Sequence, residues 1–461
     1  MRDGLRHQPR VPELWTLIEQ IQIMNNKQRL WEKGGAICLA FFTGWAISCS
    51  GQIDPSGGPA KVEIRKADKA YKLYVNNRPF YIKGAGLGGG GQDSLARHGG
   101  NSLRTWESNN GRAVLNRALT NGCYVTMGLR VGLERRGFDY NDTSAVNRQL
   151  ETIKTEVMKY KDHPALIIWA IGNELNLQAK NPKVWDAVND ISKMIHQIDT
   201  NHLTTTPIAG INPQLIHEIK IRAPDLDLLA IQTYGGIAGL PDALKKSEWD
   251  KPYIITEWGA TGYWEVKKTG WGAPIEEDSS AKADSYRKRY ETVIAADRDQ
   301  CLGSYVFLWG QKQERTPTWF GVFLESGEET ESVDVMHYLW TGKWPENRSP
   351  RLAGAWLDGK AALENIRVRP NQTYGARISV ADPDKDSLTY RWEVVEETKT
   401  HSTGGDWEEK SPAISGLIQE QNKSEILMKA PEMPGAYRLF VYIFDGHGHA
   451  GHANIPFYVE R

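Results

Sequence analysis

Two stretches of the chain share one design, a short apolar run that ends in a glutamate. The first, 165–176, reads ALIIWAIGNELN and carries Glu174 directly after its apolar run. The second, 251–262, reads KPYIITEWGATG and carries Glu257 in the same place. Such a run is typical of a strand buried on both faces of a parallel sheet. Because an α/β barrel places its chemistry at the C-terminal ends of its strands, the two stretches predict a (β/α)8 barrel.

The spacing of the two glutamates favours a shared site. Positions 174 and 257 leave room for two further strand–helix units, so a closed barrel would bring the two carboxyl groups face to face. Two carboxyl groups across a glycosidic bond hydrolyse it with retention when they are about 5.5 Å apart, and with inversion when they are further apart. A competing interpretation makes Glu174 a cap of the helix that follows its strand.

The motifs WAIGNE and ITEWG resemble the catalytic pair of the retaining β-glycosidases of clan A. The resemblance is greatest to the barrel domain of glycoside hydrolase family 2 and covers about residues 71–345. It implies Glu174 as general acid/base at the end of strand four and Glu257 as nucleophile at the end of strand seven. It implies no metal and no organic cofactor.

Four further residues match supporting positions of the same family pattern. Arg104 falls at the C-terminal end of the expected strand 101–106, and an arginine there would keep the nucleophile ionised. Tyr234 ends the expected strand 226–234 and matches a tyrosine that hydrogen-bonds the nucleophile. Asn173 matches the residue that binds the sugar 2-hydroxyl, and Trp309 matches the aromatic floor of the sugar site. The competing interpretations are a structural ion pair for Arg104 and an ordinary wall aromatic for Tyr234.

Loops after strands seven and eight carry further candidates for sugar binding. We expect Trp258 and Trp264 to be exposed above the site, where flat aromatic faces form sugar subsites. In the polar stretch after Trp309, Gln311 is expected to hydrogen-bond sugar hydroxyls and Trp319 to stack on a sugar. A solvated loop is the competing interpretation of this stretch.

The domain organisation follows from changes in pattern along the chain. The barrel with an N-terminal β-hairpin is expected over 61–345, and the hairpin over 61–78 should close its base. We expect no long sandwich domain before the hairpin, which departs from the pattern of full-length family 2 enzymes. After a linker, short alternating strands over 352–461 predict a small all-β immunoglobulin-like sandwich that resembles PKD and cadherin modules. The other barrel elements are expected as strands at 80–86, 124–130, 202–208 and 303–309, and helices at 112–121, 144–161, 182–198 and 279–296.

The N-terminal region reads as an export signal. Residues 34–48 are apolar, follow Lys27, Arg29 and Lys33, and are too short to span a membrane comfortably. With Cys49 after AIS, residues 24–48 resemble a bacterial lipoprotein signal, which implies lipidation of Cys49 and an exported protein of the cell envelope or cell surface. Residues 49–60 are expected to be a tether. Residues 1–23 are interpreted as a spurious extension upstream of the true start at Met24.

Charge and aromatic content narrow the range of expected binding partners and substrates. The 56 basic and 57 acidic residues form no basic stripe, so nucleic acid is not expected as a partner. The 17 Trp and 18 Tyr fit a protein that binds an oligo- or polysaccharide. The barrel plus one C-terminal immunoglobulin-like domain resembles glycoside hydrolase family 158, which implies a β-1,3-glucan substrate. The alternatives are an exo-acting β-galactosidase or β-mannosidase, a transglycosylase, and a surface glycan-binding lipoprotein without catalysis.

An aspartate run in the expected sandwich is the remaining metal candidate. Asp382, Asp384 and Asp386 alternate along a polar segment, but the spacing lacks a full calcium loop. We interpret them as turn residues.

Overall fold

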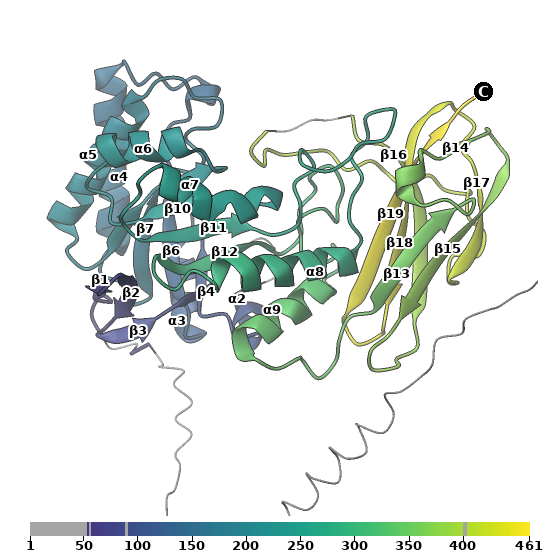
Figure 1. Cartoon of the computed structure of the whole chain (residues 1–461), viewed down its shortest axis with the longest axis horizontal. Coiled ribbons are helices and arrows are strands. Elements are labelled where there is room, and N and C mark those ends of the chain that lie inside the picture. Colours follow the sequence, from purple (N-terminus) through teal and green to yellow (C-terminus); the bar gives the residue numbers. More distant parts are fainter. Residues whose placement is uncertain (1–52, 55–56, 88–90, 400–402) are drawn as a thin grey trace, which may run out of the picture. The chain divides into compact units, whose positions relative to one another are not determined.

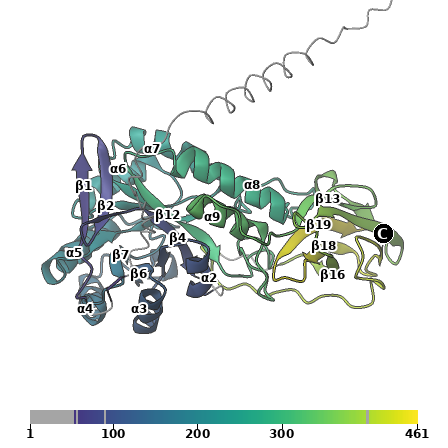
Figure 2. The same cartoon turned by 90° about the horizontal axis from the view of Figure 1, so that it is seen from below.

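The computed structural model describes residues 53–54, 57–87, 91–399 and 403–461, which fall within one compact unit, Gly51–Arg461. Figures 1 and 2 show this part of the chain in two orthogonal views. The expected extension 1–23, the leader 24–48 and Cys49 lie outside the described residues. Within those residues, no helix is both long enough and apolar enough to cross a bilayer.

A three-stranded antiparallel sheet precedes the barrel. Its strands are β1 (Val62–Ala67), β2 (Ala70–Val75) and β3 (Arg78–Phe80), paired in that order. Val62, Leu73 and Val75 are buried in one apolar cluster with Ile82 and Ile254 of the barrel strands. The sheet is therefore attached to the barrel through its apolar side chains.

The central sheet is parallel and closes on itself. Its hydrogen-bonded order is β8-β7-β6-β5-β4-β12-β11-β10-β9. Its strands are β4 (Ile82–Leu87), β5 (Ser102–Arg104), β6 (Tyr124–Leu129), β7 (Leu166–Ile171), β8 (Leu203–Thr205), β9 (Pro207–Ala209), β10 (Leu229–Gln232), β11 (Tyr253–Trp258) and β12 (Cys301–Trp309).

The end strands β8 and β9 are two halves of the predicted strand five. Only Thr206 separates them, and its hydroxyl donates to the carbonyl of Ile171 at the end of β7 (2.8 Å). The first half pairs with β7 and the second with β10, so one broken strand closes the sheet. The predicted eight-stranded barrel is confirmed.

Helices cover the outside of the barrel (Figure 1). They are α2 (Gln92–Arg97), α3 (Gly111–Thr120), α4 (Thr143–Tyr160), α5 (Lys183–Ile198), α6 (Pro213–Arg222), α7 (Leu240–Lys246), α8 (Ser279–Arg289) and α9 (Glu331–Thr341), with short turns η1 (Glu134–Arg136), η2 (Gly235–Gly239), η3 (Tyr290–Ile294) and η4 (Ala362–Glu364). The carboxylate of Asp142 accepts the backbone N–H groups of Ser144 and Ala145 and caps α4. The predicted helix 279–296 is divided into α8 and a wider π-helical turn, η3.

The C-terminal part is a two-sheet sandwich. One sheet pairs β13 (Arg351–Leu357), β15 (Thr373–Ala381) and β17 (Glu425–Lys429), and the other pairs β14 (Arg367–Val368), β19 (Ala450–Val459), β18 (Gly435–Phe444) and β16 (Thr389–Glu396). Trp392, Met428, Leu439 and Phe457 are buried between the sheets. This confirms the predicted all-β second architecture.

The outer face of β18 and β19 is covered by the barrel. Both strands are buried along almost their whole length. In an isolated sandwich, the outer face of each sheet would be exposed to solvent and every second residue would be exposed. The guanidinium of Arg438 donates to the carbonyl of Pro274 (2.9 Å), and the Asn454 amide donates to Glu276 (2.6 Å). The sandwich is thus joined to the barrel by buried polar contacts as well as by apolar packing.

Candidate active site

Glu174 lies in a tight turn directly after β7. Gly172 and Glu174 both have positive φ, 72° and 50°, and the backbone N–H of Glu174 donates to the carbonyl of Pro207 (3.0 Å). A non-glycine residue with positive φ is uncommon and often marks a functional turn. The competing interpretation of Glu174 as a helix cap is wrong, because α5 begins only at Lys183.

Glu257 lies at the penultimate position of β11 and is 5% exposed. Its Oε1 accepts three hydrogen bonds, from Arg104 Nη1 (3.0 Å), Trp106 Nε1 (2.7 Å) and Gln232 Nε2 (3.0 Å). Its Oε2 accepts one, from the Tyr234 hydroxyl (2.9 Å). Oε1 is therefore saturated with donors, while Oε2 retains a lone pair that can attack a substrate.

Asn173 connects this donor set to the turn that carries Glu174. Its Oδ1 accepts from Arg104 Nη2 (2.8 Å) and from Gln232 Nε2 (2.7 Å). Because the oxygen is occupied, the amide N–H₂ group is the part of Asn173 that remains available, and it donates to no described residue. A donor at this position can bind a sugar hydroxyl.

The electrostatics separate the two carboxyl groups. Burial, followed by the negative charge of Glu257, raises the pKa of Glu174 to about 8, against the opposing effects of Arg104 and Arg135. Glu174 is therefore protonated at neutral pH and accepts no hydrogen bond from a described residue. Burial first, and then the two glutamates, raise the pKa of Tyr234 well above its usual value, so its hydroxyl remains a donor.

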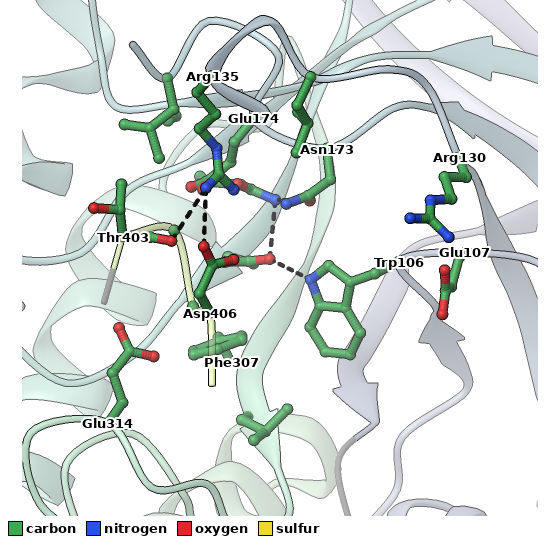
Figure 3. Close-up of a pocket in the computed structure, with 18 of the residues that line it drawn as sticks. Trp106, Glu107, Arg130, Arg135, Asn173, Glu174, Phe307, Glu314, Thr403 and Asp406 are labelled. Atoms are coloured by element: carbon green, nitrogen blue, oxygen red, sulfur yellow. Dashed lines mark hydrogen bonds and ion pairs between the residues drawn. The ribbon is translucent and has the colours of Figure 1, made fainter. Parts of the chain in front are cut away.

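Both glutamates line one large cavity of about 1650 Å³, several of whose residues are shown in Figure 3. Typical small-molecule sites measure roughly 300–1,000 Å³, so this cavity has room for more than one sugar unit. The lining also includes Trp106, Asn173, Tyr234, Tyr263, Trp264, Phe307, Leu308, Gln311, Lys312, Glu314 and Phe320.

Of the predicted binding residues, the structure brings Arg104, Asn173 and Tyr234 together around Glu257. Trp264 is 53% exposed at the cavity, where its ring contacts Tyr234 edge-on. Gln311 also lines the cavity, although its amide N–H₂ donates to the carbonyl of Pro317 (3.1 Å).

Three predicted tryptophans do not line the cavity, and these predictions are corrected. Trp258 continues β11 beyond Glu257, so strand alternation turns it outward onto Tyr286 and Tyr290. Trp309 is fully buried against Trp340 and Phe323. Trp319 is also buried, and its indole N–H donates to the carbonyl of Thr261.

Phe307 lines the cavity where Trp309 had been expected. The two residues lie on the same strand, but the pairing of β12 with β4 shifts register between Val306 and Trp309. The side chain of Phe307 makes edge contacts with Trp106 and Tyr234. Phe307 is thus part of the aromatic wall around the nucleophile.

Sequence reasoning also missed Trp106 and Gln232, the two further donors to Glu257. Each lies two positions from a residue that had been identified, Trp106 from Arg104 and Gln232 from Tyr234. Side chains two apart on a strand share a face, so strand alternation was the signal that could have found them. Glu314 and the sandwich segment 403–406, which also reach the cavity, carry no comparable signal.

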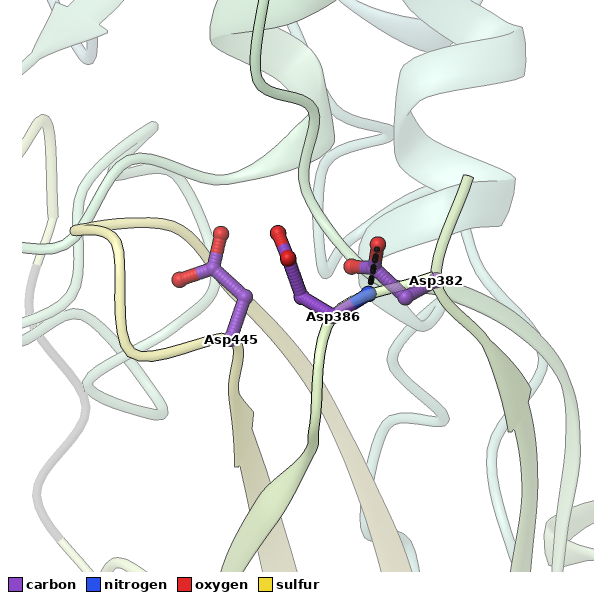
Figure 4. Close-up of side chains that lie close together, drawn as sticks. All are labelled: Asp382, Asp386 and Asp445. Carbon is purple, nitrogen blue, oxygen red and sulfur yellow. Dashed lines mark hydrogen bonds between the residues drawn. The ribbon is translucent and has the colours of Figure 1, made fainter. Parts of the chain in front are cut away.

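The described carboxylates that could hold a metal lie in the sandwich, outside this cavity. Asp382, Asp386 and Asp445 each offer an oxygen within 4.8 Å of the others (Figure 4). Asp382 Oδ1 accepts the N–H groups of Asp384 and Asp386. That pattern is the turn expected from the sequence, to which the fold adds Asp445 from the β18–β19 loop.

A parallel eight-stranded barrel with a carboxyl pair at the ends of strands four and seven is an arrangement that can support glycoside hydrolysis. Residues 116–266, which include both glutamates, match the family model described as glycosyl hydrolases family 2, TIM barrel domain. This match covers the part of the barrel that carries both motifs and confirms the resemblance seen in them.

Solved structures similar to this chain include three β-glucuronidases. That of Bifidobacterium dentium, complexed with coumarin-3-O-glucuronide, has 17% identity and a TM-score of 0.47 over 61% of this chain and 49% of its own. That of Dictyoglomus thermophilum has 17% identity and a TM-score of 0.48 over 62% and 54%. That of Bacteroides uniformis has 12% identity and a TM-score of 0.46 over 87% and 48%. The chain thus spans about half the length of these proteins.

Proposed function

We propose that the protein is a retaining β-glycoside hydrolase with Glu257 as nucleophile and Glu174 as general acid/base. The observation that carries the proposal is the contrast between their environments. Glu257 accepts four hydrogen bonds, one from a buried arginine, whereas burial raises the pKa of Glu174 to about 8 and no described residue donates to it. Two carboxyl groups with opposite environments are the pattern of an acid and a nucleophile.

The reaction follows from this arrangement. Glu257 Oε2 attacks the anomeric carbon, and the proton of Glu174 passes to the departing glycosidic oxygen. The product of this step is a glycosyl ester on Glu257. Glu174, now ionised, takes a proton from water, and the hydroxide oxygen displaces the carboxylate with net retention of configuration. The free amide N–H₂ of Asn173 is placed to hold the sugar 2-hydroxyl through both steps.

For the substrate, we favour a neutral β-linked glucan, with β-1,3-glucan as the first choice. The cavity volume supports an oligo- or polysaccharide. Its charge supports a neutral sugar over a uronic acid, because the acidic lining residues outnumber the basic ones even when the protonated Glu174 is left out. The acidic residues are Glu107, Glu174, Glu257, Glu265, Glu314 and Asp406, and the basic ones are Arg130, Arg135, Arg136 and Lys312. Arg135, Arg136 and Lys312 are already bound to carboxylates.

The test is hydrolysis of a polysaccharide panel that includes laminarin, together with aryl β-glycosides and β-glucuronides. Glu174→Gln and Glu257→Gln are compared with Glu325→Gln, an exposed barrel glutamate outside the cavity. We expect the wild type and Glu325→Gln to cut laminarin into oligosaccharides, and Glu174→Gln and Glu257→Gln to leave it uncut. Activity on small β-glycosides only would keep the mechanism and reject the glucan. Glycan binding without hydrolysis would favour the non-catalytic lipoprotein.

We also propose export and lipid anchoring through Cys49. The support is the apolar stretch 34–48 after three basic residues, followed by AIS and the cysteine. Metabolic labelling with a radioactive fatty acid should mark the wild-type protein and leave Cys49→Ala unlabelled. Equal labelling of the two proteins, or of neither, would contradict the anchor.

A further inference from the structure

A segment of the sandwich reaches the catalytic cavity of the barrel. Thr403, Gly404, Gly405 and Asp406, which lie between β16 and β17, line the same cavity as Glu174. Figure 1 shows the described part of this connection extending from the sandwich towards the barrel, and Figure 3 shows Thr403 and Asp406 beside Arg135. The cavity is therefore built from both parts of the molecule.

The first barrel contact of this segment is the turn that carries Arg135. The guanidinium Nη1 of Arg135 donates to Asp406 Oδ2 (3.3 Å) and to the carbonyl of Thr403 (3.3 Å). Arg136 also donates to Asp406. The Arg135 side chain is 8% exposed, whereas that of Asp406 is 38% exposed and remains open to a ligand.

The second contact is the loop after β12. Lys312 Nζ donates to the carbonyl of Gly405 (2.6 Å) and to Glu314 (2.9 Å). The backbone N–H of Arg315 donates to the buried carboxylate of Glu408 (2.5 Å). The segment is thus tied to two separate barrel loops that both line the cavity.

Two glycines permit this close approach. Gly404 and Gly405 have φ of +60° and +72°, which other residues adopt with strain. A Cβ on Gly404 would meet Arg135 Nη2 at 2.9 Å, and one on Gly405 would meet Lys312 Nζ at 2.6 Å. Glycine at both positions avoids this backbone strain and leaves the two cations in place against the chain.

We propose that Arg135, Asp406 and the Gly404–Gly405 backbone form the leaving-group subsite, with a sugar as the preferred leaving group. This inference rests on the proposed function. A general acid must stand next to the oxygen that departs, so cavity groups near Glu174 are placed to contact the leaving group, and Arg135 is near enough to act on the charge of Glu174. A guanidinium, a half-exposed carboxylate and peptide groups bind hydroxyls, which a sugar has and an aryl group lacks. Asp406 is thus a specificity-determining residue contributed by the sandwich.

The test compares two substrates with the same sugar over Glu257: a disaccharide and the 4-nitrophenyl β-glycoside of the sugar that the wild type hydrolyses. Asp406→Ala should lower kcat/KM for the disaccharide by roughly tenfold or more, the cost of a hydrogen bond to a charged group. The loss for the nitrophenyl glycoside should be several-fold smaller. Glu325→Ala is the matched control, because it removes another barrel–sandwich ion pair, to Lys410, outside the cavity.

A second readout separates binding from a purely structural role. Without Asp406, the charge of Arg135 is less compensated and stabilises ionised Glu174 more strongly, so the alkaline limb of the pH profile should move to lower pH. Gly405→Ala, which strains the backbone of the segment and crowds Lys312, should show the same preference for the nitrophenyl substrate. Equal losses on both substrates, or none on the disaccharide, would overturn the proposal. A wild type that hydrolyses neither substrate would instead refute the proposed function.

Discussion

Replacing Arg104 with methionine tests the pairing at the centre of the site. Arg104 is fully buried and donates to Glu257, to Asn173 and to the carbonyl of Thr256. Methionine keeps an apolar side chain of similar length but removes all of these donors and the positive charge. Glu257 would then be a buried carboxylate without its ion-pair partner.

The expected magnitude follows from that burial. Removing one partner of a buried ion pair costs about 3–5 kcal/mol. If Glu257 stays ionised, this cost appears as lost stability. If Glu257 instead takes up a proton, it ceases to be a nucleophile, and the same free energy corresponds to a loss in kcat/KM of about 100-fold to a few thousand-fold at neutral pH. The loss of stability and the loss of kcat/KM both come from the unpaired Glu257. We therefore predict the sum of the two, expressed as free energy.

The assay combines urea unfolding with kcat/KM for an aryl β-glycoside across the pH range. Arg438→Met is the matched control, because Arg438 is 1% exposed and pairs with Glu397 outside the cavity. It should lose stability while the folded protein keeps its activity. The reasoning is refuted if Arg104→Met retains activity within about threefold of wild type and loses less than about 1 kcal/mol of stability.

Three further outcomes follow from single contacts. Activity should fall as pH rises above about 8, because Glu174, whose pKa burial and Glu257 raise to that value, must hold a proton; a kcat/KM profile flat to pH 10 would contradict it. Tyr234→Phe removes one hydrogen bond to charged Glu257 and should lower kcat/KM by about 10- to 100-fold with the fold intact by circular dichroism. Glu276→Gln should destabilise by about 3–5 kcal/mol in urea, because it leaves Lys282 buried without its partner. Burial would raise the pKa of Glu276, but Lys282 and nearby groups lower it to about 2. The difference in stability between wild type and Glu276→Gln should therefore shrink as the pH falls from the ordinary pKa of a glutamate towards 2.

The sequence was sufficient for features that are encoded locally. The apolar runs before Glu174 and Glu257 predicted buried parallel strands, and each strand does bury every residue. Arg104 and Tyr234 were placed correctly near the nucleophile, because Arg104 ends β5 and Tyr234 follows the end of β10 by two residues. Position along the chain therefore predicted position in the site wherever a regular strand set the direction of the side chain.

The sequence was insufficient where the direction of a side chain depends on irregular backbone or on packing between distant parts of the chain. Trp309 and Phe307 are two residues apart, and only the register shift near the end of β12 decides which of them faces the cavity. Trp258 looked like a loop residue because the strand it extends could not be seen to continue past Glu257. The contact between Arg135 and Asp406 joins residues 271 positions apart and belongs to the packing of the sandwich on the barrel, which no local pattern encodes.

The most direct test of the central claim is to trap the intermediate. The wild type is incubated with the 2-deoxy-2-fluoro glycoside of the sugar it hydrolyses, digested, and analysed by peptide mass spectrometry. The account predicts one covalently bound sugar, on the peptide that contains Glu257, and slow reactivation as the ester hydrolyses. A sugar on another residue, or an unlabelled enzyme whose normal substrate gives a product of inverted configuration, would contradict it.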